Sequence, residues 1–304
     1  MKNGRKLLCH LTALAVVTVW GSTFVFTKLL LLAGLSAAQI FTLRFIVAYV
    51  LLLLYALSRP NFRLFSCTVA DELLMAGLGL TGGSLYFLTE NSAMNYTTTT
   101  NTSLIVSLCP LLTTVLVTLF HPSERLVPRQ ILGTLIAAAG VIIVVFNGHF
   151  VLHLSPLGDA LAFAACLCWA VYSLLIIPAH QRYDTLFITR KVFFYGLLTV
   201  MPYALVSPLL PPPDLLFRPD VLANLLFLGC VASMLCFLAW NAAMKEIGAV
   251  TTTNYAYFNP VTTVLFAWVL LSEKITLYFV TGTILILVGL LMADRPSKTP
   301  NKNT

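Results

Sequence analysis

The chain carries one sequence pattern twice, and the two copies lie half a chain apart. The segment from Ala93-Met94 to Pro110 is matched by the segment from Ala243-Met244 to Pro260, so its landmarks recur after 150 residues. Further landmarks recur after 149 residues: Trp20 and Trp169, Glu124-Arg125 and Glu273-Lys274, Gly133 and Gly282, Gly140 and Gly289. A repeat of this length indicates that the fold consists of two copies of one structural unit.

The composition places both copies in a lipid bilayer. Of the 304 residues, 59% are hydrophobic and 10% are charged, whereas a typical soluble domain has roughly 25% charged residues. Apolar runs close to the ~20 residues that span a bilayer recur along the whole chain, so a soluble protein with a very apolar core is disfavoured. The net charge of +7 comes from Lys and Arg spread between these runs, which orients a membrane protein and offers no basic patch to nucleic acid.

We therefore predict an all-α integral membrane protein with ten transmembrane helices. Helix is required because an isolated strand in lipid leaves its backbone polar groups unpaired, and the alternating ten-residue segments of a membrane barrel are absent. The predicted helices cover about 8–32, 37–57, 71–92, 97–120, 128–147, 156–177, 186–207, 221–243, 250–271 and 275–293. The predicted organisation is one five-helix repeat over 1–150, a second over 151–295, and a cytoplasmic tail over 296–304.

The distribution of basic residues sets the predicted orientation. Fourteen Lys and Arg fall on one side of the ten spans, and three fall on or near the other side, namely Lys28, Arg218 and Lys274. Because cytoplasmic loops are rich in Lys and Arg, both termini are predicted to be cytoplasmic. Five helices per repeat is an odd number, so the second copy enters the membrane in the opposite direction. This is the inverted-repeat design of secondary transporters.

Short motifs occur in a consistent order in both halves. The first half contains Trp20-Gly21-Ser22-Thr23-Phe24, Arg44-Phe45, Ala93-Met94 through Pro110, Glu124 and Gly133. The second half contains Gly158-Asp159, Trp169-Ala170-Val171-Tyr172, Ala243-Met244 through Asn259-Pro260, Glu273 and Gly282. In this order the motifs resemble the drug/metabolite transporter superfamily, specifically its EamA-type ten-helix branch, and the resemblance covers essentially the whole chain.

The resemblance implies a secondary transporter of small polar metabolites, often an exporter of amino acids or related compounds. The expected mechanism is alternating access of the two repeats around a central cavity, and the expected location is the plasma membrane, as a bacterial cytoplasmic (inner) membrane. The partners are then a small-molecule substrate and the lipid bilayer, with protons as the candidate coupling ion. Monomer and homodimer both remain open.

Two other classes of function compete with this interpretation. An intramembrane enzyme needs a nucleophile, a base or a metal set, but the five histidines lie near span ends or in loops, and neither H-E-x-x-H nor G-x-S-x-G occurs. A non-transporting membrane receptor is disfavoured because the loops are too short for a soluble sensing module. The seven cysteines have no C-x-x-C spacing and are predicted to be structural thiols. We therefore predict no catalytic residue, no metal and no cofactor.

Pro110 and Pro260 are predicted to form a pair of hinges near the middle of the fourth and ninth helices. A proline there removes one backbone hydrogen bond and leaves the carbonyls of Val106 and Ala256 without their usual donor. Such carbonyls are tolerated at membrane depth where they face protein or a wet cavity. A packing kink without ligand contact is the alternative.

Polar and aromatic side chains near these prolines are candidates for the walls of a substrate cavity. The asparagines Asn101, Asn254 and Asn259 are costly to bury, although the threonines around them commonly serve helix packing. Aromatic rings in the interior of the spans offer flat apolar walls, with core packing as the alternative interpretation. The aromatic candidates are Trp20, Tyr86, Trp169, Tyr172, Trp240 and Tyr255.

The sharpest candidates are the ionisable residues Lys28, Arg44 and Glu90. They lie near the non-cytoplasmic ends of the first three helices, and only the first repeat carries them. Charge within a membrane span is costly and is commonly functional. A structural ion pair of Glu90 with Arg44 or Lys28 competes with substrate recognition or proton coupling.

Overall fold

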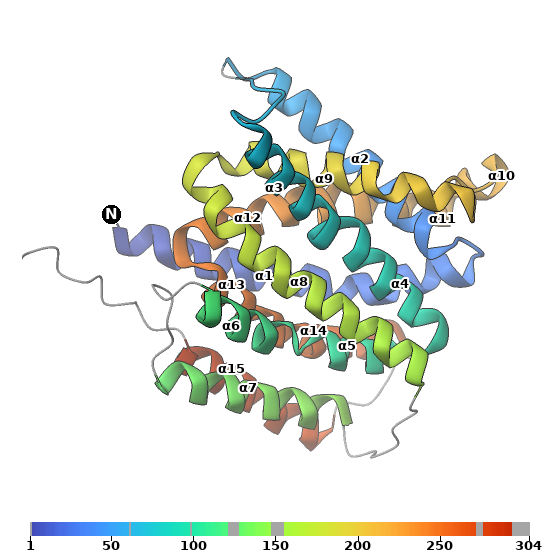
Figure 1. The fold of residues 1–304 in the computed structure, drawn as a ribbon. Helices are drawn as coiled ribbons and strands as arrows, with labels where there is room; N and C mark the ends of the chain where they lie inside the picture. The colour runs from blue at the N-terminus through green and yellow to red at the C-terminus, as the bar shows by residue number, and fades with distance from the viewer. Residues whose placement is uncertain are drawn as a thin grey trace, which may run out of the picture.

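The computed structural model describes residues 2–60, 62–97, 99–120, 128–146, 155–271 and 276–293. Every regular element within these ranges is helical (Figure 1). Both chain ends, the predicted tail 296–304 and the predicted repeat boundary at residues 150 and 151 lie outside the described residues.

The first half of the chain begins with two long helices and continues with shorter ones. In order, its elements are α1 (Lys2–Leu32), α2 (Ala37–Leu57), α3 (Val69–Gly79), the π-helical segment η1 (Leu80–Leu85), α4 (Tyr86–Tyr96), α5 (Thr99–Val106), α6 (Cys109–Phe120) and α7 (Pro128–Phe146). The start of α2 is fixed by a capping box. In it the Ser36 hydroxyl accepts from the Gln39 backbone N–H, and the Gln39 side chain accepts from the Ser36 N–H.

The second half follows a similar order. Its elements are α8 (Pro156–Arg182), α9 (Thr185–Val200), the 3₁₀ segment η3 (Met201–Leu205), α10 (Pro213–Leu216), α11 (Pro219–Leu226), the π-helical segment η4 (Phe227–Leu235), α12 (Cys236–Ile247), α13 (Ala249–Asn254), the 3₁₀ segment η5 (Tyr255–Phe258), α14 (Asn259–Leu271) and α15 (Leu277–Ala293). Gly248 separates α12 from α13 with a backbone φ of 90°, a conformation that glycine adopts at little cost.

Four helical stretches are long and apolar enough to cross a membrane on their own. They are Gly4–Leu32, Ala37–Leu57, Pro156–Arg182 and Pro219–Ile247, and the last of them runs unbroken through α11, η4 and α12. Less than half of each apolar window is buried inside the protein, so the remaining apolar surface faces outward. The chain is thus an all-α protein with membrane-like helices.

Several predicted helices contain a segment that is not α-helical, and two of them are divided just before a proline of the sequence repeat. The predicted span 97–120 is divided into α5 and α6, and the predicted span 250–271 is divided into α13, η5 and α14. Pro110 and Pro260 are each the second residue of the helix that follows the break. The prediction placed both prolines inside continuous helices, and this detail is wrong. A proline has no N–H, so it is best accommodated in the first turn of a new helix, where no donor is needed.

The two halves share an irregularity that the sequence pattern does not reveal. The π-helical segments η1 and η4 end 150 residues apart, at Leu85 and Leu235, which is the offset of the sequence repeat. Each lies in the interior of a longer helical run, between α3 and α4 and between α11 and α12. Single π turns inside α-helices are frequent at functional sites.

Helices α7 and α15 pack along each other at the lower edge of the bundle in Figure 1. A Cβ atom on Gly133 would lie 2.6 Å from the Gly289 carbonyl oxygen, and one on Gly140 would lie 2.7 Å from the Gly282 carbonyl oxygen. Glycine is needed at these points because any side chain would push the backbones apart. Gly133 is the repeat equivalent of Gly282, and Gly140 of Gly289. Exchanging the two repeats therefore converts the Gly133–Gly289 contact into the Gly282–Gly140 contact.

The remaining helices surround the centre of the bundle. Helix α1 contacts α12 and α14, whereas α8 contacts α4 and α6. Helix α2 packs against η4 and α9. This arrangement brings residues of both halves of the chain to one central space.

Candidate functional site

The central space contains a cavity of about 40 Å³. One ordered water needs roughly 10–15 Å³ of such space, so the cavity has room for a few waters. Its wall is formed by side chains from both halves of the chain, which come from α1, α2, α4, α5, α6, α8, α12, η5 and α14. Seven of the predicted site residues line it: Trp20, Arg44, Tyr86, Glu90, Trp169, Trp240 and Asn259.

Three tryptophans form one side of the cavity. The ring centroids of Trp20 and Trp169 are 5.6 Å apart in an edge-to-face arrangement, and those of Trp20 and Trp240 are 4.9 Å apart. The Tyr86 ring lies 5.0 Å from that of Trp169. Contacts of this geometry stabilise packed aromatic clusters. Because Trp20 and Trp169 are repeat equivalents, the cluster joins the two halves of the chain through matching positions.

The π-helical segment η4 holds two of the cavity residues in place. The Trp20 indole N–H donates to the Ala232 carbonyl oxygen at 2.9 Å. The adjacent Ser233 hydroxyl accepts from the Arg44 Nε–H at 2.8 Å. Residues 232 and 233 of η4 therefore fix the orientation of one aromatic wall and of Arg44, which lines the cavity.

Arg44 and Glu90 place opposite charges in the same cavity. Arg44 is 2% exposed, and its guanidinium lies 4.4 Å from the centre of the Phe87 ring. Glu90 is 8% exposed and accepts a hydrogen bond of 2.7 Å from the Tyr86 hydroxyl. The ion pairs among the described residues do not include one between Arg44 and Glu90. Arg44 and Glu90 thus have separate hydrogen-bond partners, Ser233 and Tyr86. Each can also interact with a ligand group in the cavity.

Lys28 lies outside the wall of this cavity. Its Nζ donates to the Met94 carbonyl oxygen at 2.6 Å, in the last turn of α4. A cation at this position interacts favourably with the carbonyls at the end of a helix. Of the three predicted charge-network residues, two line the cavity and the third binds a helix end.

The remaining candidates from the fourth and ninth predicted helices do not all lie at the cavity. Among the described residues, the amide oxygens of the buried Asn254 and Asn259 have no hydrogen-bond partner, and only Asn259 lines the cavity. The Tyr255 hydroxyl lies 2.9 Å from Nδ1 of His10 in α1. The Asn101 side chain lies outside what the structure describes. An unpaired amide oxygen beside a cavity is available to a bound donor group.

Tyr172 belongs to a buried polar network beside the cavity. Its hydroxyl donates to Asn241 Oδ1 at 2.7 Å, and Asn241 Nδ2 donates to the Thr189 hydroxyl at 3.0 Å. The repeat equivalent of Asn241 is Asn91, whose Nδ2 donates to the Ala37 carbonyl at 3.4 Å. The sequence prediction missed both asparagines. Each lies two residues before the repeated Ala-Met pair, so extending that comparison would have found them.

The breaks before the two prolines also face the cavity. Val106 and Ala256 both line it, and so do Cys109 and Asn259, the residues that precede Pro110 and Pro260. Both pairs are related by the offset of 150 residues. The described residues contain no group of three or more His, Cys, Asp or Glu placed to hold a metal ion.

Comparison with known proteins identifies the fold and the family. The model of the EamA-like transporter family matches residues 7–146 and again residues 156–293. A solved crystal structure superimposes with a TM-score of 0.72 at 22% identity, covering 95% of this chain and 97% of the other. At that identity the likeness shows the fold alone.

Curated relatives match over nearly their whole length. An uncharacterized transporter of Archaeoglobus fulgidus is 27% identical, over 93% of this chain and 96% of its own. A probable amino-acid metabolite efflux pump of Salmonella typhimurium is 28% identical, over 91% and 92%. A probable terminal-alkyne amino-acid exporter of Streptantibioticus cattleyicolor is 26% identical, over 93% and 91%. These relatives carry the names of transporters and not of enzymes.

The two family-model matches cover almost the whole chain, one in each half, and the helices that they cover enclose the central cavity. The chain is a membrane transporter that belongs to the EamA-like transporter family.

Proposed function

We propose that this transporter exports an amino acid or a related small polar metabolite, by alternating access of two inverted repeats around the central cavity. The observation that carries the proposal is the pairing of repeat-equivalent residues around that cavity. The wall contains five such pairs: Trp20 and Trp169, Phe87 and Phe237, Glu90 and Trp240, Val106 and Ala256, Cys109 and Asn259. A site at the interface of two inverted repeats opens to either side when the repeats exchange conformations.

The charges of the cavity support a zwitterionic substrate. The Arg44 guanidinium can bind a carboxylate, and the Glu90 carboxylate can bind an ammonium group, because no ion pair among the described residues joins the two. The aromatic rings of Trp20, Trp169 and Trp240 offer an apolar surface to the rest of the ligand. The names of the Salmonella and Streptantibioticus relatives, an amino-acid metabolite efflux pump and an amino-acid exporter, support the same substrate class.

The proposed membrane arrangement has ten spans with both termini in the cytoplasm. The spans are α1, α2, α3–α4, α5–α6, α7, α8, α9, α11–α12, α13–α14 and α15. The repeats are proposed to cover 1–150 and 151–295, with a cytoplasmic tail over 296–304. The membrane is a bacterial cytoplasmic membrane, and Glu90 is the candidate site for a coupling proton.

The test is counterflow in liposomes that contain the purified protein. Vesicles are loaded with one unlabelled amino acid at a time and take up a labelled amino acid from outside. We expect several amino acids to drive uptake, and sugars and nucleosides to fail, because they lack the paired carboxylate and ammonium groups. If no amino acid drives uptake but another class of metabolite does, the substrate proposal is wrong although the protein transports.

A further inference from the structure

A second cavity, of about 900 Å³, lies where α2 ends and α9 begins, and it shares no lining residue with the central cavity. Leu238 and Ala242 of α12 form part of its apolar wall. Four arginines and one aspartate also line it: Arg59, Arg63, Arg182, Asp184 and Arg190. The cavity therefore combines an excess of positive charge with an apolar wall.

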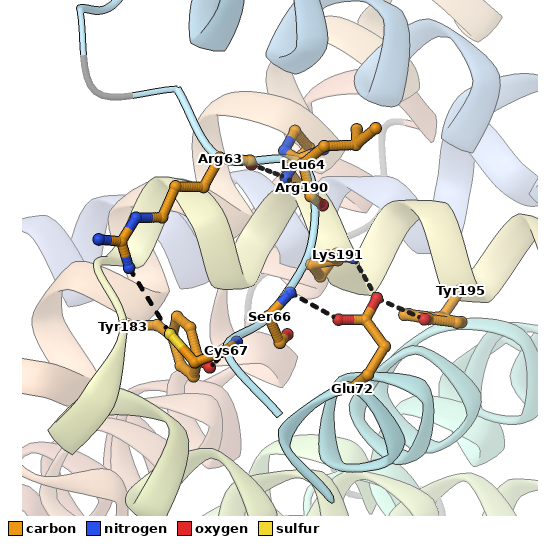
Figure 2. A network of polar contacts seen from close by, with 9 residues as sticks. All are labelled: Arg63, Leu64, Ser66, Cys67, Glu72, Tyr183, Arg190, Lys191 and Tyr195. Carbon is orange, nitrogen blue, oxygen red and sulfur yellow. Dashed lines mark hydrogen bonds and ion pairs between the residues drawn. The ribbon is translucent and has the colours of Figure 1, made fainter. Parts of the chain in front are cut away.

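The cations in and beside this cavity differ in how they are neutralised. Lys191 forms an ion pair with Glu72, which also accepts from the Tyr195 hydroxyl at 2.6 Å and from the Ser66 N–H at 2.8 Å (Figure 2). Arg182 forms an ion pair with Asp71. Both carboxylates at the start of α3 are thus already engaged by other cations.

Arg190 lacks such a counter-ion. It is 2% exposed, and no ion pair among the described residues includes it. Its Nη2 donates to the carbonyl oxygens of Arg63 and Leu64 at 2.6 and 3.2 Å (Figure 2). Asp184 lines the same cavity, but it caps α9 by accepting from the Phe187 N–H at 2.9 Å. The Glu72 and Asp184 carboxylates attract this guanidinium without forming an ion pair with it, and a buried charge without a contacting counter-ion is costly. An anion in the adjoining cavity would supply that contact.

Two exposed arginines of the cavity are also without an acidic partner among the described ion pairs. Arg59 lies over the Tyr55 ring at 4.7 Å, and Arg63 donates to the Cys67 sulfur at 3.6 Å. Three guanidinium groups, one buried and two exposed, are therefore available to one ligand. A phosphate suits this set better than a carboxylate, because it has more acceptor oxygens and matches the guanidinium fork.

We propose that this cavity is a phosphate-binding site, with Arg190 at its buried end and Arg59 and Arg63 at its mouth. An anionic phospholipid headgroup and free inorganic phosphate present the same chemistry. The apolar wall at Leu238 and Ala242 can receive the start of an acyl chain. The proposal concerns a site separate from the central cavity and does not depend on the identity of the transported substrate.

The experiment measures thermal unfolding of the purified full-length protein in detergent. Phosphatidylglycerol, phosphatidylcholine and inorganic phosphate are titrated separately, since a ligand that binds the folded state raises the melting temperature. A rise with phosphatidylglycerol but not with phosphatidylcholine assigns the site to an anionic lipid. A rise with inorganic phosphate as well assigns it to soluble phosphate. If neither anion stabilises the protein more than phosphatidylcholine does, the proposal is overturned.

Variants of the arginines then test whether the stabilising anion binds in this cavity. The double variant Arg59→Gln/Arg63→Gln removes two exposed cations and keeps the backbone carbonyl that Arg190 binds. We expect its stabilisation midpoint to shift to at least about tenfold higher ligand concentration. The matched control is Arg218→Gln, an exposed arginine paired with Asp220 before α11, which should titrate like the parent. A double variant that also titrates like the parent would place the anion elsewhere and contradict the proposal.

Discussion

At the scale of single residues, Arg44 and Glu90 line the same cavity, but no ion pair among the described residues joins them. Arg44 donates to Ser233, and Glu90 accepts from Tyr86. The competing interpretation of the sequence, a direct structural pair, predicts that removing both charges restores stability. The observed partners predict otherwise, because each substitution leaves a different buried group unsatisfied.

The first prediction follows from this separation. Glu90→Gln retains the hydrogen bond with Tyr86 but removes the charge, so the protein should fold and its apparent substrate affinity should fall about tenfold or more. Counterflow as a function of substrate concentration measures the loss. Glu246→Gln is the control, because Glu246 pairs with Arg5 at the exposed end of α12. Normal affinity and an unchanged pH profile in Glu90→Gln would exclude both substrate binding and proton coupling at this residue.

Single residues also mark the limit of sequence reasoning. Tryptophans and charges in the interior of apolar runs stand out, and this is why Trp20, Arg44 and Glu90 were predicted. Lys28 stands out for the same reason but binds the end of α4. The sequence gives its depth in the bilayer and not the direction in which α1 presents it. Asn241 was missed because its position was not compared with that of its repeat equivalent, Asn91.

At the scale of the elements, the structure adds irregularities that apolar patterns do not encode. The apolar runs 71–92 and 221–243 predict plain helices, yet each contains a π segment, because the extra residue changes backbone hydrogen bonding without changing the apolar content. The prolines do signal a disturbance at 110 and 260. Their effect is a new helix start and not a kink within one helix.

The second prediction concerns these helix starts. Pro110→Ala and Pro260→Ala each restore an N–H that can extend the following helix backward across the break. We expect both variants to reach the parental folded yield and to transport several-fold more slowly, because the break lines the cavity on each side. Fluorescence-detected size exclusion gives the yield and counterflow gives the rate. Parental rates in both variants would exclude a hinge role.

The third prediction concerns the crossing of α7 and α15. Gly140→Ala places a methyl group 2.7 Å from the Gly282 carbonyl oxygen, so the helices must separate, at a cost of about 1–3 kcal/mol. A lower melting temperature in detergent measures this cost. Gly4→Ala is the control, because the added carbon has no described atom within 4 Å outside its own stretch of helix. Equal melting temperatures for the two variants would mean that α7 and α15 accommodate the methyl group without loss of stability.

At the scale of the whole molecule, the sequence predicts the class of fold well and its packing poorly. The hydropathy pattern and the doubled motifs predict an all-α membrane protein of the EamA type, and the family match confirms this. Neither pattern states that α7 packs on α15 or that α1 packs against α12 and α14. Which helices become neighbours depends on the shapes of their faces, and composition does not record those shapes.

The fourth prediction concerns topology, since both chain ends lie outside the described residues. The excess of Lys and Arg on one side predicts that both termini are cytoplasmic. Fusions of green fluorescent protein and of alkaline phosphatase to each terminus test this in a bacterial host. Fluorescence without phosphatase activity is expected at both ends. Phosphatase activity at either end would contradict the proposed ten-span arrangement.

The glycine crossings between α7 and α15 have a consequence for the ancestry of the chain. Exchanging the two halves maps the contact of Gly133 with Gly289 onto that of Gly282 with Gly140. A free half-length protein could therefore have made the same contact with a second copy of itself, inserted in the opposite orientation. Gene duplication and fusion would then turn a dimer interface into an internal one and raise the effective concentration of the two partners. On this account, the contact between α7 and α15 would correspond to the former dimer interface.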